Sequence, residues 1–467
     1  MSTVVGIKGV LKEVLKTKSG LVAIILLVSI TTVSLAVPFY APPDVIKAWN
    51  TPTAWLDNPK CAAPKWVQLF TKKKLPETII ARNEDFISEN FSIAIPGYPI
   101  QFVYIYKTFF FDYYYDDFPS EFVLNITTTS NQTVALTIRL KRPDGDILNI
   151  TSTTITKKQP LLLYDSELSD VAMNYFVGVT GKQLNFTPQA RIVFFAEKGE
   201  NMANARVATV LKGRYTLEII AKTTDPQGRL YTKFVLYGKV YGLAGTDSKR
   251  RDLLIGLLWG APVALAFGLA AALAITLIQS LLGVISGYFG GKVDEVIQRL
   301  TELMMIIPVL PILILIMFLY RVTIWLLLLI IIGFGIVGST TKTIRSMVPS
   351  IKEEQYILAA KSYGASSWRI VFRHVFPRVL PYTFSLIALG VPAYIFLEAS
   401  LSYLGLGDPV LPTWGKILGE AQAANAAYFG YWWWIILPAV CIMITATAFA
   451  LLGYAFDKIV NPRLREI

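Results

Sequence analysis

The chain has 467 residues, of which 54% are hydrophobic and only 16% charged, and its mean hydropathy is +0.50. A soluble domain of this length carries about a quarter charged residues, so the composition excludes an ordinary globular protein. The net charge of +12 comes from lysines and arginines that stand mostly at the ends of apolar runs. This distribution favours a role in orienting membrane spans over binding to nucleic acid.

Six apolar segments are predicted to cross a membrane. The first is a charge-free run of 20 residues, about 30 Å long as a helix, which matches the hydrocarbon core of a bilayer. The second apolar run is too long for one span, so we divide it into an interfacial piece at 253–259 and a span that follows. The predicted spans are 20–39, 261–285, 303–320, 323–337, 381–397 and 432–454.

Lysine and arginine in short loops predict the orientation of these spans. Basic residues are concentrated in the N-terminal tail, in the loop after span four and in the C-terminal tail, represented by Lys8, Lys12, Lys16, Lys18, Lys342, Arg345, Lys458, Arg463 and Arg465. We therefore expect a multi-pass protein of the cell membrane with both termini cytoplasmic and residues 43–244 extracytoplasmic. One local exception is Lys249-Arg250-Arg251, which precedes span two on the outside.

The segment 43–244 has the pattern of a β-domain. Residues 133–140 alternate apolar and polar, 143–146 (Pro-Asp-Gly-Asp) supply a turn, and 147–150 resume the strand. Further strands are predicted at 191–195, 215–221 and 231–240, which together suggest a β-sandwich. The aromatic stretch 102–115 is assigned to the sandwich core, with a ligand-contact surface as the alternative.

Glycosylation acceptors give independent support for the predicted extracytoplasmic location of residues 43–244. The triplet Asn-X-Ser/Thr begins at five positions, all within the predicted outer segment: Asn90, Asn125, Asn131, Asn149 and Asn185. A β-domain rich in serine and threonine also makes such triplets by chance. If the sites are used, they place this segment on a glycosylating cell surface.

The loop after span four, 350–378, carries the most functional information. It predicts a short helix, a break at Gly364 and a second helix capped by Ser366 or Ser367. Ala359 and Ala360 are small enough for a partner to approach the backbone closely. Arg369, Arg373 and Arg378 recur at helical spacing and can face an acidic partner or lipid head groups. An interfacial amphipathic helix is the alternative interpretation.

This loop resembles the EAA loop of ABC-importer permeases. The spacing of Ala359-Ala360, Gly364 and Pro377 matches that motif, although Leu358 stands where its glutamate is expected. Arg373-His374 before the proline resembles the subfamily that transports dipeptides, oligopeptides and nickel.

Three further stretches resemble the C-type permease of that subfamily. They are 245–254, 287–294, and 398–407 together with 412–415. In the first of them Arg250 replaces the usual glycine. The tail 461–464 also resembles that of the C-type permease. The resemblance is weak over 1–42 and strong over 245–467, and it does not include the inserted domain. It implies a membrane all-α bundle of six helices, of the type I ABC-importer kind. The inserted all-β extracytoplasmic domain is expected from the strand pattern of residues 43–244 alone.

The resemblance also implies partners. A second homologous permease, two ATPase subunits and a substrate-binding protein are expected, with ATP and magnesium bound by the ATPases. The contact with an ATPase is expected at Tyr356, Ala359, Ala360, Gly364, Ala365, Arg369 and Pro377. The chain lacks a Gly-x-x-x-x-Gly-Lys-Ser/Thr phosphate loop, so it is not expected to be an enzyme, and with the single His374 it is not expected to hold a metal.

Polar residues in the spans are candidates for a translocation path. Gln279, Glu398 and Thr445 can line such a path, or can serve as structural hydrogen-bonding groups between helices. We expect a permease for peptides or similar small oligomers, with oligosaccharides and nickel as other cargoes. The alternatives are a membrane-anchored receptor whose β-domain binds ligand without transport, and an ion-coupled secondary transporter, for which the spans offer few ionisable groups.

Overall fold

The computed structural model describes residues 13–94, 101–320 and 322–460. Lys8, Lys12, Arg463, Arg465 and the motif at 461–464 lie outside the described residues. The chain divides into two compact units. One unit combines Met1–Thr51 with Leu254–Ile467, and the other is Pro52–Leu253.

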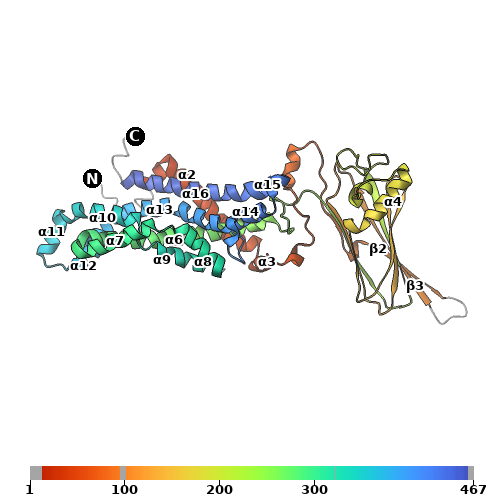
Figure 1. The fold of residues 1–467 in the computed structure, drawn as a ribbon, viewed down its shortest axis with the longest axis horizontal. Coiled ribbons are helices and arrows are strands. Elements are labelled where there is room, and N and C mark those ends of the chain that lie inside the picture. The colour runs from red at the N-terminus through yellow and green to blue at the C-terminus, as the bar shows by residue number, and fades with distance from the viewer. Residues whose placement is uncertain (1–12, 95–100, 321, 461–467) are drawn as a thin grey trace. The chain divides into compact units, whose positions relative to one another are not determined.

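The first unit is a bundle of apolar helices (Figure 1). Four of its helices are each long and apolar enough to cross a membrane, and two bent pairs raise the number to six if each pair is one span. This agrees with the predicted membrane bundle. The helices are α2 (Lys18–Tyr40), α3 (Pro43–Lys47), α6 (Leu253–Phe289), α7 (Gly291–Ile306), α8 (Val309–Tyr320), α9 (Ile324–Phe334), α10 (Ser339–Lys352), α11 (Gln355–Ser362), α12 (Ser367–Ile370), α13 (Phe376–Leu401), α14 (Trp414–Ala423), α15 (Ala426–Phe429) and α16 (Trp432–Val460).

Two details of the predicted spans are wrong. The separate interfacial piece at 253–259 does not exist, because α6 is one continuous helix of 37 residues. The span predicted at 303–320 is instead broken between α7 and α8, which meet at 69°. Pro308 explains the break: proline disfavours helical backbone at the residue before it, and Ile307 is extended, with φ −65° and ψ 124°.

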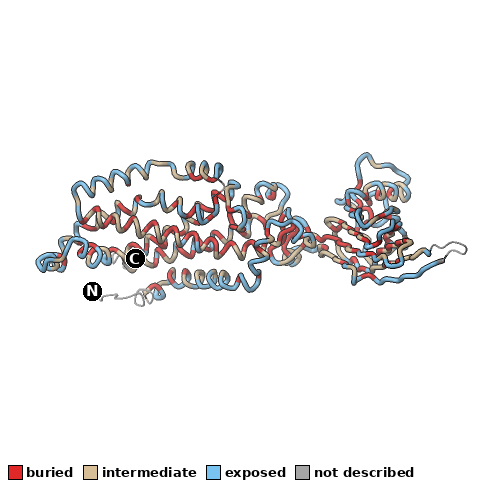
Figure 2. Tube along the Cα trace, turned by 90° about the horizontal axis from the view of Figure 1, so that it is seen from below, coloured by how far each residue is buried: buried red, intermediate tan, exposed pale blue. Residues whose placement is uncertain are grey.

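Helix packing leaves much apolar surface uncovered. The long helix α16 packs against both α13 and α2, and a buried cluster that includes Phe267, Leu313 and Leu327 joins α6, α8 and α9. Only 17% of the most apolar window of α2 is buried, and Figure 2 shows mostly exposed and intermediate residues along the helix that follows the N-terminus. Such an exposed apolar helix is suited to contact with lipid.

The second unit is a β-sandwich with helical additions. Its sheets have the strand orders β1-β9-β4-β7 and β2-β3-β8-β5-β6. Residues from both sheets, among them Leu124 and Leu217, share one buried core. The strands are β1 (Ile79–Ala81), β2 (Ile87–Ala94), β3 (Gln101–Tyr113), β4 (Glu121–Thr128), β5 (Val134–Lys141), β6 (Ile147–Ile155), β7 (Leu161–Tyr164), β8 (Gly213–Thr223) and β9 (Leu230–Tyr237).

The strands predicted at 133–140, 147–150, 215–221 and 231–240 correspond to β5, β6, β8 and β9. The strand predicted at 191–195 is wrong, because these residues begin with the helical turn α5 (Ala190–Val193). Ile192 to Phe195 are all buried, and the guanidinium of Arg142 donates hydrogen bonds to the carbonyls of Val193 and Phe194. The domain also contains the helix α4 (Ser169–Thr180), so it is not purely β.

The aromatic stretch at 102–115 contributes to both faces of its sheet. Phe111 and Tyr113 of β3 are buried in the sandwich core, as predicted. Tyr104 and Tyr106 instead stack on Phe91 of the neighbouring strand, at ring-centroid distances of 5.3 and 5.2 Å.

Candidate functional site

The loop after α10 folds into a helical elbow, which we define as residues 355–375. Helix α11 ends before Gly364, whose φ of +78° is favourable only for glycine. Helix α12 then starts at Ser367 and is capped by Ser366, whose side chain accepts a hydrogen bond from the backbone N–H of Arg369 at 3.4 Å. The predicted helix–glycine–helix arrangement is confirmed. Figure 1 shows α11 and α12 together at one end of the helical bundle.

Buried aliphatic side chains fasten the elbow to the bundle. Ile357 of α11 and Ile370 of α12 are buried in a cluster with Val284 of α6 and Val348 of α10. The π-helical turn η5 (Val371–Val375) joins α12 directly to α13 and adds two more residues to this cluster. Movement of the elbow is therefore coupled through packed side chains to α6, α10 and α13.

The elbow also carries exposed aromatic side chains, one of which contacts the bundle: the centroid of the Trp368 ring lies 5.1 Å from that of the Phe289 ring in α6. Tyr363 is 92% exposed, and Trp368 and Phe372 are each about half exposed and stack on one another. Sequence reasoning missed these three residues; the signal for them was their aromatic character in a loop rich in basic residues. Exposed aromatic side chains of this kind are typical of a protein interface.

Most of the predicted coupling residues lie on this elbow. Tyr356, Ala359, Gly364 and Arg369 are exposed, and Ala360 and Ala365 are half-buried. Pro377 lies just beyond it, in the first turn of α13, directly after the π-helical turn η5.

A charged network connects α7 to α10 beside the elbow. Arg345 of α10 donates two hydrogen bonds to the carboxylate of Asp294 in α7, the one from Nε to Oδ1 measuring 2.5 Å. Ser286 of α6 donates to the same oxygen, also at 2.5 Å, and accepts a hydrogen bond from Gln298. Asp294 belongs to the 287–294 motif, so the structure gives that motif a role in holding three helices together.

Close backbone packing supports this network. A Cβ added to Gly287 of α6 would lie 2.9 Å from the carbonyl oxygen of Arg345 and 2.7 Å from Cβ of Val348. A Cβ added to Gly283, one turn earlier, would lie 2.7 Å from the carbonyl oxygen of Thr341. Helix α10 can therefore lie directly on α6 only because these two positions lack side chains.

The three candidates for a translocation path lie on different helices and are not brought together. Gln279 of α6 donates from Nε2 to the carbonyl oxygen of Gly335 at 2.7 Å, where α9 ends. Glu398 of α13 is buried and accepts a hydrogen bond from Ser402 at 2.6 Å. Thr445 donates to the carbonyl of Cys441 in its own helix. Each has a structural hydrogen bond, and none lines the cavity described next.

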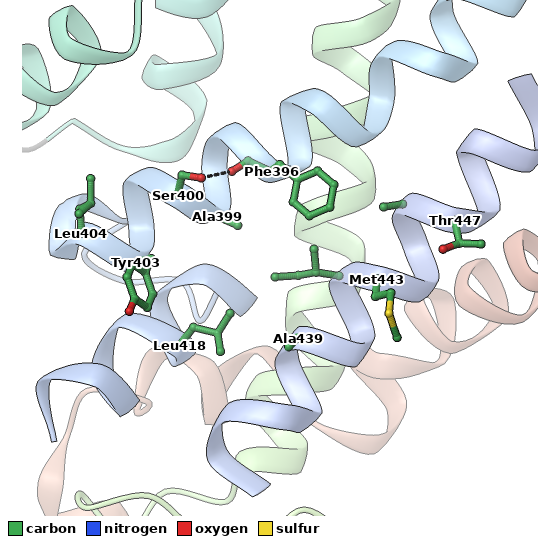
Figure 3. A pocket seen from close by; sticks show the side chains of 11 residues that line it. Phe396, Ala399, Ser400, Tyr403, Leu404, Leu418, Ala439, Met443 and Thr447 are labelled. Atoms are coloured by element: carbon green, nitrogen blue, oxygen red, sulfur yellow. Dashed lines mark hydrogen bonds between the residues drawn. The ribbon is translucent and has the colours of Figure 1, made fainter. Parts of the chain in front are cut away.

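An apolar cavity of about 670 Å³ lies between α13, the π-helical turn η6 (Ser402–Leu406), α14 and α16. Figure 3 shows Phe396, Tyr403, Met443 and Thr447 around it. Its volume falls within the range of pockets that hold small molecules. Thr447 and the hydroxyl of Tyr403 are among its few polar groups.

Comparison with known proteins identifies the family. Residues 279–466, which include the elbow and the cavity, match the family described as binding-protein-dependent transport system inner membrane component. A dipeptide transport system permease protein of Bacillus subtilis (strain 168) is 33% identical over 223 residues, which cover 48% of this chain and 69% of that protein. The chain belongs to this family of inner membrane permeases.

Other permeases of the family show the same level of similarity. An oligopeptide transport system permease protein of Bacillus subtilis (strain 168) is 34% identical over 225 residues, covering 48% of this chain and 72% of that protein. A glutathione transport system permease protein of Pectobacterium atrosepticum is 30% identical over 228 residues, covering 48% and 73%. The chain is thus a permease component rather than a receptor without transport activity. The β-sandwich lies outside the residues matched to the permease family.

The five glycosylation triplets differ in their surroundings. Asn90, Asn131, Asn149 and Asn185 are exposed. Asn125 is half-buried in β4, which has strand partners on both sides, opposite Leu162 and Lys233.

Proposed function

We propose that this permease is the C-type subunit of an importer for peptides or similar small oligomers, driven by ATP hydrolysis on partner subunits. The elbow carries the proposal. It carries exposed aromatic side chains, and its buried aliphatic side chains pack against the helices that must move. An ATPase bound to the exposed side chains would transmit its closure through Ile357 and Ile370 to the bundle.

The proposed complex contains a second homologous permease, two ATPase subunits and a substrate-binding protein. We expect two permeases and two ATPases because ATPase subunits that act as a pair need two membrane bundles, one for each ATPase to move. The peptide class is supported by the names of the relatives, which transport dipeptides, oligopeptides and glutathione. Oligosaccharides are the second candidate class.

The proposed orientation puts the elbow and both termini in the cytoplasm and residues 43–244 outside. The basic triplet Lys249-Arg250-Arg251 does not contradict it. Arg250 is paired with Glu121, and Arg251 is buried in an ion pair with Asp247. These two arginines therefore contribute little free positive charge beside the start of α6. Their ion pairs explain why basic residues occur here on the outer side, although lysine and arginine are usually enriched in cytoplasmic loops.

The variant Gly364→Pro tests the coupling role of the elbow. Proline cannot adopt the φ of +78° found here, so the bend between α11 and α12 must change. We expect normal membrane insertion but loss of substrate-stimulated ATP hydrolysis in the reconstituted complex. Gly181→Pro is the matched control, because Gly181 also ends a helix, with φ +64° and open space around it, but lies in the β-sandwich.

Retained substrate-stimulated ATPase activity in Gly364→Pro would contradict the coupling role. A second variant, Ala359→Arg, leaves the backbone unchanged and adds bulk at an exposed position of the elbow, so it should lower co-purification of the ATPase subunits. Asn174→Arg on the exposed side of α4 is its control. Stimulation of ATP hydrolysis by labelled peptides, and not by sugars, would establish the substrate class.

Glycan attachment tests the proposed outer location of the β-sandwich. We expect modification at Asn90, Asn131, Asn149 and Asn185, which are exposed, and none at Asn125, which is half-buried in a central strand. Mass spectrometry of the protein from its native membrane, compared with single Asn→Gln variants, measures this. Unmodified asparagine at all four exposed positions would count against the outer location of the β-sandwich.

A further inference from the structure

A short loop of the β-sandwich unit presents apolar side chains beside a cluster of lysines. We define the lysine-aromatic loop as residues 65–74, with the sequence Lys-Trp-Val-Gln-Leu-Phe-Thr-Lys-Lys-Lys. Its first part is the 3₁₀-helix η2 (Lys65–Phe70). Leu69 and Phe70 are each 82% exposed, so almost none of their apolar surface is buried by the protein.

The loop is held rigidly in this exposed arrangement. The backbone N–H of Lys65 donates to the carbonyl of Gly242 at 2.9 Å, and Trp66 Nε1 donates to the carbonyl of Leu243 at 2.8 Å. The Trp66 ring then contacts the edge of Phe70 at a centroid distance of 6.1 Å. Leu243 is itself 65% exposed and extends the apolar surface. The tip is therefore fixed by hydrogen bonds at its base, and its exposed side chains are a built feature of the fold.

The side chains of the loop itself carry charge of one sign, and Asp116 beside it accepts a hydrogen bond from the backbone N–H of Lys74 at 2.7 Å. The loop has four lysines and no acidic residue. Lys65 is paired with Glu77, and Lys74 Nζ lies 5.3 Å from the ring centroid of Tyr115. Lys72 and Lys73 are exposed and form no ion pair with any residue that the structure describes.

We propose that the lysine-aromatic loop docks onto the anionic lipid head groups of the outer leaflet, with Leu69 and Phe70 inserted at the level of the acyl-chain boundary. Apolar side chains flanked by lysines bind anionic membranes through combined burial and electrostatic attraction. The unit that carries the loop is joined at both of its ends to membrane helices, α2 before it and α6 after it in the sequence. A protein partner fits less well, since lysine is depleted in protein interfaces.

The test uses the full-length permease in lipid nanodiscs, in a background with Cys61→Ser and Cys441→Ser. Leu69→Cys is labelled with an environment-sensitive fluorophore, and Val207→Cys, an equally apolar exposed position of the same unit, serves as the matched control. In nanodiscs with anionic lipid, we expect blue-shifted emission at position 69, quenching by spin labels near the head of the acyl chain, and protection from aqueous iodide. The label at position 207 should show none of these.

A charge variant tests the electrostatic half of the proposal. Lys72→Gln combined with Lys73→Gln should lower the ratio of inserted to water-exposed label at position 69 by roughly fivefold per lysine, the fold change that corresponds to about 1 kcal/mol for each lysine near an anionic surface. The same ratio should fall in nanodiscs made only of zwitterionic lipid.

Three results would overturn the proposal. The first is equal iodide quenching at positions 69 and 207. The second is insertion that does not depend on anionic lipid or on Lys72 and Lys73. The third is protection of position 69 only after partner subunits or a binding protein are added, which would assign the loop to a protein interface. None of these results depends on the identity of the imported substrate.

Discussion

Asp294 of α7 accepts two hydrogen bonds from the guanidinium of Arg345 in α10. The pair connects the helix before a proline break to the helix that leads into the elbow. Replacing Asp294 by Asn leaves the shape but removes the charge, so the paired hydrogen bonds to Arg345 weaken. We expect Asp294→Asn to destabilise the α7–α10 contact by about 1–2 kcal/mol and to lower substrate-stimulated ATP hydrolysis in the reconstituted complex.

The same two helices provide the control. Glu302 of α7 is paired with Lys342 of α10 at 3.3 Å, but both side chains are more than 40% exposed. Exposed ion pairs contribute little to stability, so Glu302→Gln should leave thermal stability and ATP coupling close to those of the native protein. Equal effects of the two variants would show that the Asp294–Arg345 pair has no special role.

The contact between α6 and α10 should be sensitive to a single methyl group. Gly287→Ala places a Cβ 2.7 Å from Val348 Cβ and 2.9 Å from a backbone oxygen, so α10 must move away. Overpacking of this kind costs about 1–3 kcal/mol, measured as a loss of thermal stability of the purified permease. Gly333→Ala in α9 is the control, because no atom lies within 4 Å of its added Cβ. Unchanged stability of Gly287→Ala would mean that the two helices are less closely packed than the structure shows.

Arg250 combines a favourable ion pair with an unfavourable, left-handed backbone conformation. Its guanidinium binds Glu121 and the carbonyl of Asn58 and lies 4.0 Å from the ring centroid of Tyr237, while its φ is +67°. Arg250→Ala removes the contacts and keeps the strain, so we expect a loss of about 3 kcal/mol in the stability of the β-sandwich unit. Arg250→Gly also loses the contacts but relieves the backbone, which should recover about 1 kcal/mol.

Hydrogen exchange of β4 and β9 peptides in the full-length protein measures both variants. Arg214→Ala is the control, since the Arg214–Asp112 pair is exposed. If Arg250→Gly were less stable than Arg250→Ala, the positive φ would carry no cost and the argument from backbone strain would be wrong.

The β-sandwich unit should lose local stability in acid at Asp57. Burial opposes ionisation of this carboxyl, but its ion pairs with Lys233 and Arg82 outweigh that effect and hold the pKa of Asp57 below its ordinary value of 3.8. The stabilisation is therefore fully present above that value and is lost as the pH falls through the lower pKa of the folded state. Hydrogen exchange around Lys233 should increase over this acidic range in the native protein.

Asp57→Asn removes the titrating group. We expect this variant to be less protected than the native protein near neutral pH and to show a weaker dependence on pH in acid. Asp170→Asn, at an exposed position of α4, should keep the native pH dependence. An unchanged acid response in Asp57→Asn would assign that response to other carboxyl groups.

Sequence reasoning predicted the features that depend on local pattern. The apolar runs located the membrane helices, alternation located β5, and Gly364 located the elbow, because each signal lies within a few neighbouring residues. The strand predicted at 191–195 is wrong because the structure there depends on a residue that is distant in sequence. Its apolar residues become a helical turn through the hydrogen bonds of Arg142, which is distant in sequence and could not be paired with them in advance.

The contacts of the site were also beyond sequence reasoning. Asp294 belongs to a recognised motif, but its partner Arg345 lies 51 residues away, and nothing in the pattern joins them. Gln279, Glu398 and Thr445 were chosen as polar groups in apolar spans, and the structure gives each of them a hydrogen bond. The cavity is lined mainly by apolar residues, which have no distinctive signal among so many others.

No loop separates the elbow from the cavity, because the π-helical turns η5 and η6 continue α13 at its two ends. From Ser367 to Leu404 the backbone is helical without a break, about 57 Å measured along the helix, and Gly405 with φ +82° interrupts it. Trp368 is near its beginning, and Phe396 and Tyr403 are on the cavity wall near its other end. A displacement of the Trp368 end therefore meets no loop before the cavity, and we expect it to reach the cavity wall as a tilt or a rotation of the helix.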